Sequence, residues 1–170
     1  MAKKETIFST STVTHVGVFS FPKFYKFCND WIMSEIEPTI FNEPNYSEKI
    51  IGDGKDIDIV WKFQKKFTNY FRFDGKIKFK TSGMKKVELE KDSKKINANQ
   101  GEVVMKIDGE LVSDYENKFD NSKAMQTWRN IYEKWIIKSR VDHFEGRVDD
   151  YCNRLMEEAK AFLELEGNRG

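Results

Sequence analysis

The sequence predicts an α+β fold in which a curved antiparallel β-sheet grips a long C-terminal α-helix, with one N-terminal helix between the first two strands. Three observations predict it. A strand pattern and a helix pattern follow each other near the N-terminus, the middle of the chain alternates apolar and polar residues, and the last third has apolar residues at spacings of three and four. A sheet with one apolar face needs a covering layer, and the C-terminal stripe can supply it.

The first two predicted elements are a strand and a helix. Residues 12–19 are β-branched and apolar, which favours a strand. Pro22 follows, and proline suits the first turn of a helix. The apolar residues of this helix recur at spacings of three and four: Phe24, Phe27, Cys28, Trp31 and Ile32. Pro38 is expected to end the helix.

The middle of the chain has a period of two. Apolar residues between Ile57 and Phe79 lie almost wholly at odd positions, and most lysines lie at even positions. This pattern predicts half-buried antiparallel strands with one wet face. Lys65 interrupts the alternation and is expected to mark a turn. Asp74-Gly75 is either a hairpin turn or a bulge, since both preserve the pattern.

Two further strands are expected before the C-terminal region. Residues 86–91 form one, residues 92–101 are polar and read as a turn region, and residues 102–115 alternate again. Gly109 falls on the apolar side of the last strand. A glycine there leaves room for a neighbour or lets the strand bend.

The C-terminal region is predicted to be helical in two pieces. Asn121 or Ser122 can cap the first helix. Its apolar stripe consists of Met125, Trp128, Ile131, Tyr132 and Trp135, and a second stripe that is out of phase with it runs from Ile137 to Phe162. We therefore expect a break near Ser139 and a long helix to about Leu165. The chain contains no repeats and no low-complexity linker, so residues 1–170 are interpreted as a single domain.

Composition narrows the class of protein. The chain has 170 residues with 14 Phe, 6 Tyr and 4 Trp, and this apolar content excludes a disordered chain. Its net charge is only +1, so the protein as a whole has no electrostatic attraction for nucleic acids or membranes. It shows no signal-peptide pattern and no apolar run long enough to span a membrane. Cys28 and Cys152 are far apart and form no C-x-x-C pair. Two lone thiols without an export signal favour a cytoplasmic protein with free thiols, and a single disulfide between them is the minor alternative.

Motifs for catalysis, metals or nucleotides are missing from the sequence. His15 and His143 are the only histidines, and they have no metal-ligand spacing. The chain has no nucleophile elbow, no G-x-G-x-x-G and no P-loop. We therefore expect no metal and no cofactor and favour a non-catalytic protein, although catalysis stays open because a sequence hides which groups converge in space.

The pattern as a whole resembles the START-like (SRPBCC, helix-grip) superfamily, also described as polyketide-cyclase-like or Bet v 1-like. The resemblance lies in THVGVFSFPKFYKFCNDW, in the alternating stretches 57–81 and 102–115, and in the helical segment from Trp128 to Gly167. It covers nearly the whole chain but includes no diagnostic motif, and the family usually has two short helices where this chain shows one. The resemblance implies a cavity between sheet and helix that holds lipids, sterols, polyketides or hormones. Some members bind proteins, and a few are cyclases or hydrolases.

The leading functional hypothesis is the binding of an apolar or aromatic small molecule in a hydrophobic cavity. The candidate lining residues are large side chains on the apolar face of the sheet and on the first C-terminal helix: Trp61, Phe63, Phe71, Phe73, Phe79, Met105, Ile107, Trp128 and Tyr132. The alternative for the same residues is that they simply fill a packed core.

Two other functions remain open. A protein-interaction or structural assembly subunit without a ligand is suggested by the missing catalytic groups and the out-of-phase stripe at 125–135. Nucleic-acid binding is the weakest hypothesis. Residues 51–100 hold 13 Lys+Arg against 7 Asp+Glu, but the alternation puts most aromatic residues and most cations on opposite faces. Tyr70 and Arg72 are the exception, because their even numbers predict a shared outer face.

Overall fold

The protein is described by a computed structural model that covers residues 2–119 and 122–168. Five antiparallel strands form one sheet in the order β1-β5-β4-β3-β2. The strands are β1 (Lys3–Phe19), β2 (Ile40–Ile51), β3 (Gly54–Lys66), β4 (Phe71–Lys91) and β5 (Lys94–Ser113). The helices are α1 (Phe21–Trp31), α2 (Lys123–Ile131) and α3 (Lys138–Gly167), and the π-helical turns are η1 (Ile32–Ile36) and η2 (Tyr132–Ile136).

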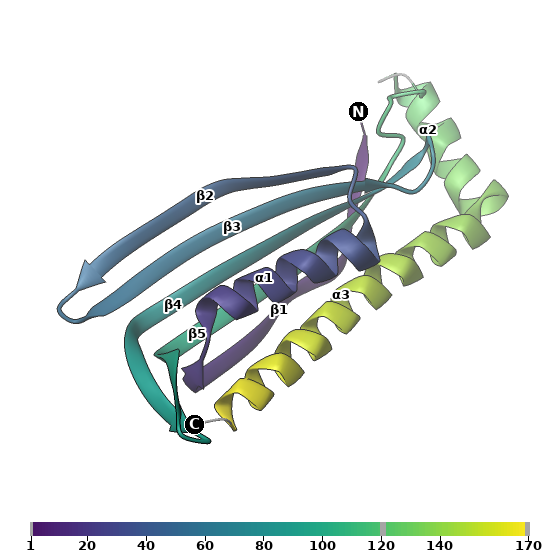
Figure 1. Ribbon diagram of the computed structural model, residues 1–170. Coiled ribbons are helices and arrows are strands. Elements are labelled where there is room, and N and C mark those ends of the chain that lie inside the picture. The colour runs from purple at the N-terminus through teal and green to yellow at the C-terminus, as the bar shows by residue number, and fades with distance from the viewer. Residues whose placement is uncertain (1, 120–121, 169–170) are drawn as a thin grey trace.

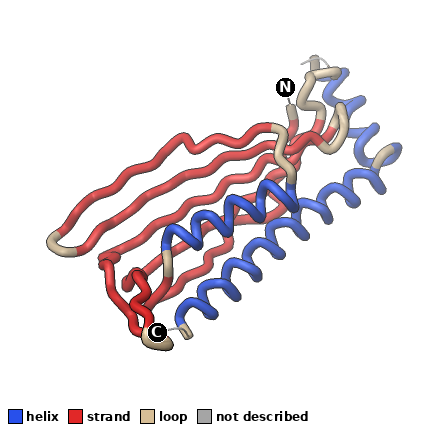
Figure 2. The backbone as a smooth tube through the Cα atoms, in the orientation of Figure 1, coloured by secondary structure: helices blue, strands red, loops and turns tan. Residues whose placement is uncertain are grey.

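The long helices cover one face of the sheet, which confirms the predicted fold class (Figures 1 and 2). α1 connects β1 at one edge of the sheet with β2 at the other. It begins with Pro22 in its first turn, and it buries Phe21, Phe24, Cys28 and Trp31. These are the positions at which a helix of 3.6 residues per turn presents one face to the sheet.

Two strand boundaries differ from the prediction because pairing extends past the apolar residues. β1 begins at Lys3, which pairs with Ser113, although only residues 12–19 were expected. β4 and β5 continue as a long hairpin through most of the expected turn region, and only residues 92 and 93 leave the strands. Both of these residues have positive φ angles, 51° and 65°, as a two-residue hairpin turn requires.

Two predicted turn positions are wrong, and one strand was not predicted. The β3–β4 turn lies at residues 67–70 and not at Lys65. Asp74-Gly75 is neither a turn nor a bulge, because β4 runs through it with regular pairing to both neighbours. β2 was not predicted: it is an edge strand whose residues are nearly all exposed, so it shows little apolar alternation.

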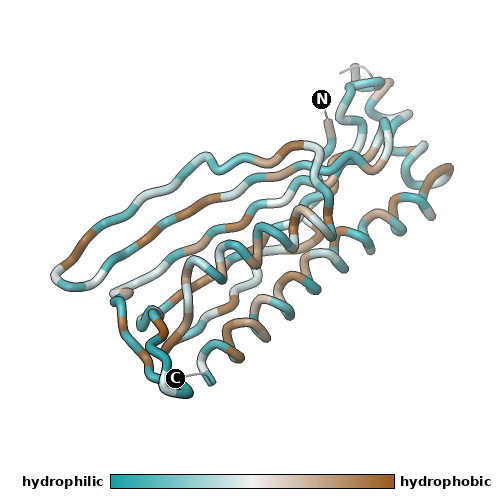
Figure 3. Tube along the Cα trace, in the orientation of Figure 1, coloured by the Kyte–Doolittle hydropathy of each residue, from teal (hydrophilic) through white to brown (hydrophobic). Residues whose placement is uncertain are grey.

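The predicted odd–even alternation is confirmed in β3, β4 and β5. Odd-numbered residues point to the helices over residues 57–63 of β3, 71–81 of β4 and 103–111 of β5, and most of them form the core together with buried residues of α1 and α3. After the irregular pairing between Ser82 and Lys85, the buried residue of β4 is the even-numbered Met84. Even-numbered lysines point to the other side, the outer face of the sheet. Figure 3 shows the resulting alternation of hydropathy along the strands. The sheet is therefore half-buried, with one dry face and one wet face.

Two glycines on the dry face lie opposite each other in β4 and β5. A Cβ atom on Gly75 would lie 2.1 Å from Cζ of Phe63, so the Phe63 ring lies directly over this glycine. A Cβ atom on Gly109 would lie 2.8 Å from Sγ of Cys152 and 3.0 Å from Cγ1 of Val148. Gly109 thus leaves room for a neighbour, and that neighbour is α3.

The C-terminal helices follow the prediction with one shift. Ser122 caps α2, because its Oγ accepts a hydrogen bond from the backbone N–H of Met125 (3.3 Å), whereas Asn121 lies outside the described residues. The break lies at Ile137, with φ −118° and ψ 20°, and not near Ser139. α3 then presents one buried stripe to the sheet: Val148, Cys152, Leu155, Ala159 and Leu163.

We predict that Gly109→Ala destabilises the protein by about 1–3 kcal/mol, because the added methyl group overpacks the contact between β5 and α3. Urea unfolding followed by circular dichroism measures this change. Gly146→Ala is the matched control, since a Cβ atom there meets nothing within 4 Å and alanine favours the helix by about 1 kcal/mol. Equal stability of Gly109→Ala and the wild type would contradict direct packing of α3 on Gly109.

Candidate functional site

Seven of the nine predicted cavity residues are buried in the core between sheet and helices. Each is at most 3% exposed: Trp61, Phe63, Phe71, Phe73, Phe79, Met105 and Ile107. Their rings pack against one another, with centroids 4.7 Å apart for Trp61 and Phe79 and 5.3 Å apart for Phe63 and Phe73. A side chain that lined a cavity wide enough for water would expose surface to it. The interior is therefore filled at these seven positions.

The other two predicted cavity residues lie elsewhere. The side chain of Trp128 in α2 is 61% exposed, so it does not line the interior. Tyr132 is half-buried at the end of the sheet, with its ring 5.9 Å from Tyr70 and 5.8 Å from Phe119. The structure thus brings seven of the nine residues together in the core, places Tyr132 against the margin of that core and leaves Trp128 exposed.

A carboxylate of the edge strand β2 lies at the margin of the buried aromatic residues. Glu43 accepts hydrogen bonds from the Tyr25 hydroxyl (2.5 Å) and from Nε1 of Trp61 (2.8 Å). Burial raises the pKa of Tyr25, and the bond to Glu43 raises it further. Beyond Glu43, the side chain of Tyr46 is half exposed. Sequence reasoning missed Glu43 because β2 itself was not predicted.

The two thiols and the two histidines are not arranged as a catalytic or metal site in the described residues. Burial raises the pKa of Cys28 and raises that of Cys152 to about 12, so both free thiols stay protonated at neutral pH. His15 lies at the rim of the core, where Nε2 is 3.2 Å from the carbonyl oxygen of Val18. His143 is exposed on α3. Among residues 2–119 and 122–168, no three His, Cys, Asp or Glu side chains are grouped as metal ligands.

The outer face of the sheet carries most lysines of the alternating strands, and two of its cations contact an aromatic ring, since Arg72 and Lys66 lie 5.4 and 5.9 Å from the Tyr115 ring centroid. Lys62 pairs directly opposite Lys76, and Lys78 pairs opposite Lys106. The predicted placement of Tyr70 on this face is wrong. Tyr70 lies in the β3–β4 turn, where the chain leaves the alternating pattern, and its hydroxyl donates a hydrogen bond to Glu133 (2.8 Å).

An exposed apolar surface lies on α2 and η2. It consists of Trp128, Ile131, Trp135 and Ile136, whose side chains are 61%, 40%, 74% and 64% exposed, and we call it the α2–η2 face. The first three residues are spaced by three and four, so they share one side of the helix. These residues make up most of the first C-terminal stripe, which was predicted to be out of phase with the second. Most of this stripe is therefore exposed to solvent.

The opposite side of α2–η2 is fixed to the sheet by polar contacts. Glu133 is 7% exposed and accepts hydrogen bonds from Nζ of Lys3 (2.9 Å) and from the Tyr70 hydroxyl (2.8 Å). Nη1 of Arg129 lies 4.0 Å from a carboxylate oxygen of Asp114, which is buried. These contacts orient the two helical turns so that the tryptophans point away from the sheet.

The pKa of Glu133 reflects this attachment. Burial alone would raise the pKa, but the hydrogen bonds from Lys3, Tyr70 and Ser113 outweigh burial, and the net shift is downward. A carboxyl group whose pKa is lower in the folded state than in the unfolded state stabilises the fold at pH values above the unfolded pKa. That stabilisation is lost as the pH falls through the folded pKa.

Comparison with known proteins gives no family assignment. No protein-family model, no curated protein and no solved structure matches the chain. None of the helices in the described part of the chain is long and apolar enough to cross a membrane.

We predict that Glu133→Gln lowers the free energy of unfolding at neutral pH by about 1–3 kcal/mol, because a buried charged acceptor is lost from Lys3 and Tyr70. The difference from the wild type should shrink as the pH falls from about 4.3, the ordinary pKa of glutamate, through the lower folded pKa. Urea unfolding between pH 7 and pH 3 measures it.

The matched control is Glu157→Gln, which removes an exposed carboxylate of α3. This variant should be close to the wild type in stability across the same pH range. A Glu133→Gln effect no larger than that of the control would contradict the attachment of η2 through Glu133.

Proposed function

We propose that the chain is a non-catalytic binding module that docks onto a larger partner surface through the α2–η2 face. The observation that supports the proposal is the exposure of two tryptophans and two isoleucines on one short helical segment. Buried tryptophans contribute strongly to binding at interfaces. A second group of exposed apolar residues lies on the edge strand β2 and contains no tryptophan: Ile40, Tyr46, Ile50 and Ile51. Other exposed apolar residues, such as Val16 and Leu165, lie singly on separate elements, which is normal for a protein surface.

The packing of the rest of the molecule suits this role. The seven predicted cavity residues are fixed in a filled core, so they provide a rigid support. Glu133 and Arg129 fix the α2–η2 face relative to that support. A face held in one orientation loses little conformational entropy on binding. The proposed relationship to the START-like superfamily is compatible with such a role, since the resemblance includes members that bind proteins.

Site-specific photo-cross-linking tests the proposal. We predict that p-benzoylphenylalanine at position 128 or 135 forms covalent adducts with proteins or lipids in a whole-cell extract that contains membranes. The same group at position 50 should form few adducts, because Ile50 is 76% exposed but lies on β2. Mass spectrometry identifies the adducts.

Competition serves as the control for specificity. Excess wild-type protein should suppress the adducts, and excess protein with Trp128→Ser and Trp135→Ser should not. Adducts that are equally abundant at position 50, or that the double variant suppresses as well as the wild type, would overturn the proposal.

Binding of an apolar or aromatic small molecule is the second proposal, and the position of Glu43 favours it. Glu43 is a polar group at the margin of an aromatic cluster, and β2 beside it is largely exposed. A ligand would lie on this open edge, because the space around Phe73 and Met105 is filled. Pockets for small molecules combine apolar walls with a few placed polar groups in this way.

Native mass spectrometry separates the two proposals. Under the leading proposal, the purified protein should have the mass of the chain alone under both native and denaturing conditions. A mass excess that disappears on denaturation, and that is lost in Glu43→Gln but kept in Glu48→Gln, would instead establish the small-molecule site.

A further inference from the structure

We propose that the partner of the α2–η2 face is an anionic lipid surface, on which this helical segment lies at the level of the headgroups. The inference rests on the proposed function and names the chemistry of the partner. It is based on three features of residues 122–140: the position of the segment in the molecule, the charge around the apolar side chains, and the residue types exposed.

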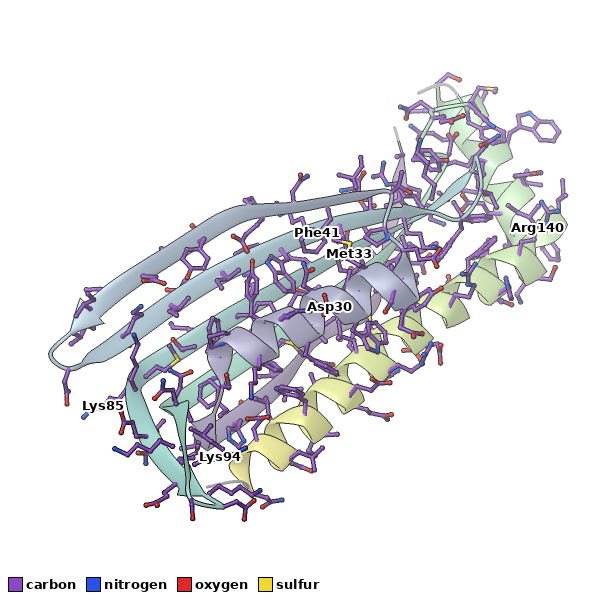
Figure 4. The ribbon with its side chains drawn as sticks, in the orientation of Figure 1. Asp30, Met33, Phe41, Lys85, Lys94 and Arg140 are labelled. Carbon is purple, nitrogen blue, oxygen red and sulfur yellow. The ribbon has the colours of Figure 1, made fainter. Side chains whose placement is uncertain are left out.

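Position is the first feature. α2 and η2 lie at the end of α3 near the N-terminus of the chain, away from the tips of the two long hairpins (Figure 1). Arg140, near the start of α3, is at the same end of the molecule, whereas Lys85 and Lys94 are at the opposite end (Figure 4). The segment can therefore meet a flat surface without obstruction from the hairpin tips.

Charge is the second feature. Residues 122–140 contain five basic residues and one acidic residue, Glu133, which is buried against Lys3 and Tyr70. The exposed cations of the segment are Lys123, Lys134, Lys138 and Arg140. The segment therefore presents positive charge and no exposed carboxylate. This charge complements an anionic surface, and it would repel a second copy of the same face.

Residue type is the third feature. The indole ring combines a large apolar body with an N–H donor, and tryptophan is enriched where membranes meet water. Trp128 and Trp135 are the two most exposed tryptophans of the described chain, and Nζ of Lys134 lies 5.4 Å from the Trp135 ring centroid. A helix with lysines flanking an apolar side that contains tryptophan is typical of segments that lie in a membrane interface.

The size of the face distinguishes a lipid surface from an acidic protein partner. α2 and η2 together have 14 residues, so the segment is about 21 Å long. Four apolar side chains on such a segment are fewer than a specific protein interface uses, which buries about 800 Å² per partner. Shallow insertion of tryptophans combined with attraction by lysines needs no complementary pocket, and a lipid surface is the partner that fits it.

Vesicle co-sedimentation tests the inference with the full chain. We expect binding to vesicles of phosphatidylcholine mixed with phosphatidylglycerol, weak or no binding to pure phosphatidylcholine, and loss of binding as salt is raised. Trp128→Ser with Trp135→Ser should weaken binding at least about tenfold, since it removes the inserted apolar surface. Lys134→Gln with Lys138→Gln should weaken it about tenfold or more, since each lysine near the surface contributes about 1 kcal/mol.

The matched control is Lys76→Gln with Lys78→Gln, which removes two cations from the outer face of the sheet and should leave vesicle binding unchanged. All substituted side chains are at least partly exposed, and unchanged circular dichroism and unfolding midpoints verify that each variant is folded. Equal loss in the control, equal binding to both kinds of vesicle, or no binding would overturn the inference. Adducts at positions 128 and 135 with an acidic protein, without vesicle binding, would overturn the lipid partner and leave the docking function standing.

Discussion

The close approach of α3 to the sheet at Gly109, beside the paired Gly75, is the constraint on which the rest of the structure depends. The two glycines lie opposite each other on the dry face of β4 and β5, where one is covered by the Phe63 ring and the other by Val148 and Cys152. Any side chain at Gly109 would push α3 outward and open space between the layers. Because glycine stands there, the helix rests on the strands, and the aromatic residues of β3 and β4 form a packed core.

The core is filled at the seven predicted cavity positions, and the polar attachment of η2 determines which side of α2 and η2 is exposed to solvent. Glu133 is buried on the inner side of the segment, where Lys3 and Tyr70 donate hydrogen bonds to it. The tryptophans are on the other side. A buried, hydrogen-bonded carboxylate is costly to displace, so these contacts favour this orientation of the helical segment. The apolar residues outside the main stripe are therefore exposed, and in our proposal they are the residues that contact the partner.

The sequence alone predicted the elements that have a clear hydrophobic periodicity. It did not predict contacts between residues that are far apart in the chain. The alternation of apolar and polar residues predicted the middle strands and their dry face. The phase difference between the two C-terminal stripes predicted a helix break, which lies at Ile137. β2 was missed because an exposed edge strand has little alternation. The partners of Glu43 and Glu133 were invisible, since each is set by pairing between distant elements. Trp128 was assigned to a cavity because a stripe alone does not say which side faces the sheet.

Hydrogen exchange of the full chain, measured by mass spectrometry with and without phosphatidylglycerol-containing vesicles, tests the central claim most directly. The account predicts slower exchange in residues 123–136 when vesicles are present and no change in α1, β2 or β3. Unchanged exchange in residues 123–136, or protection confined to α1 and the β2–β3 hairpin, would contradict docking through the α2–η2 face.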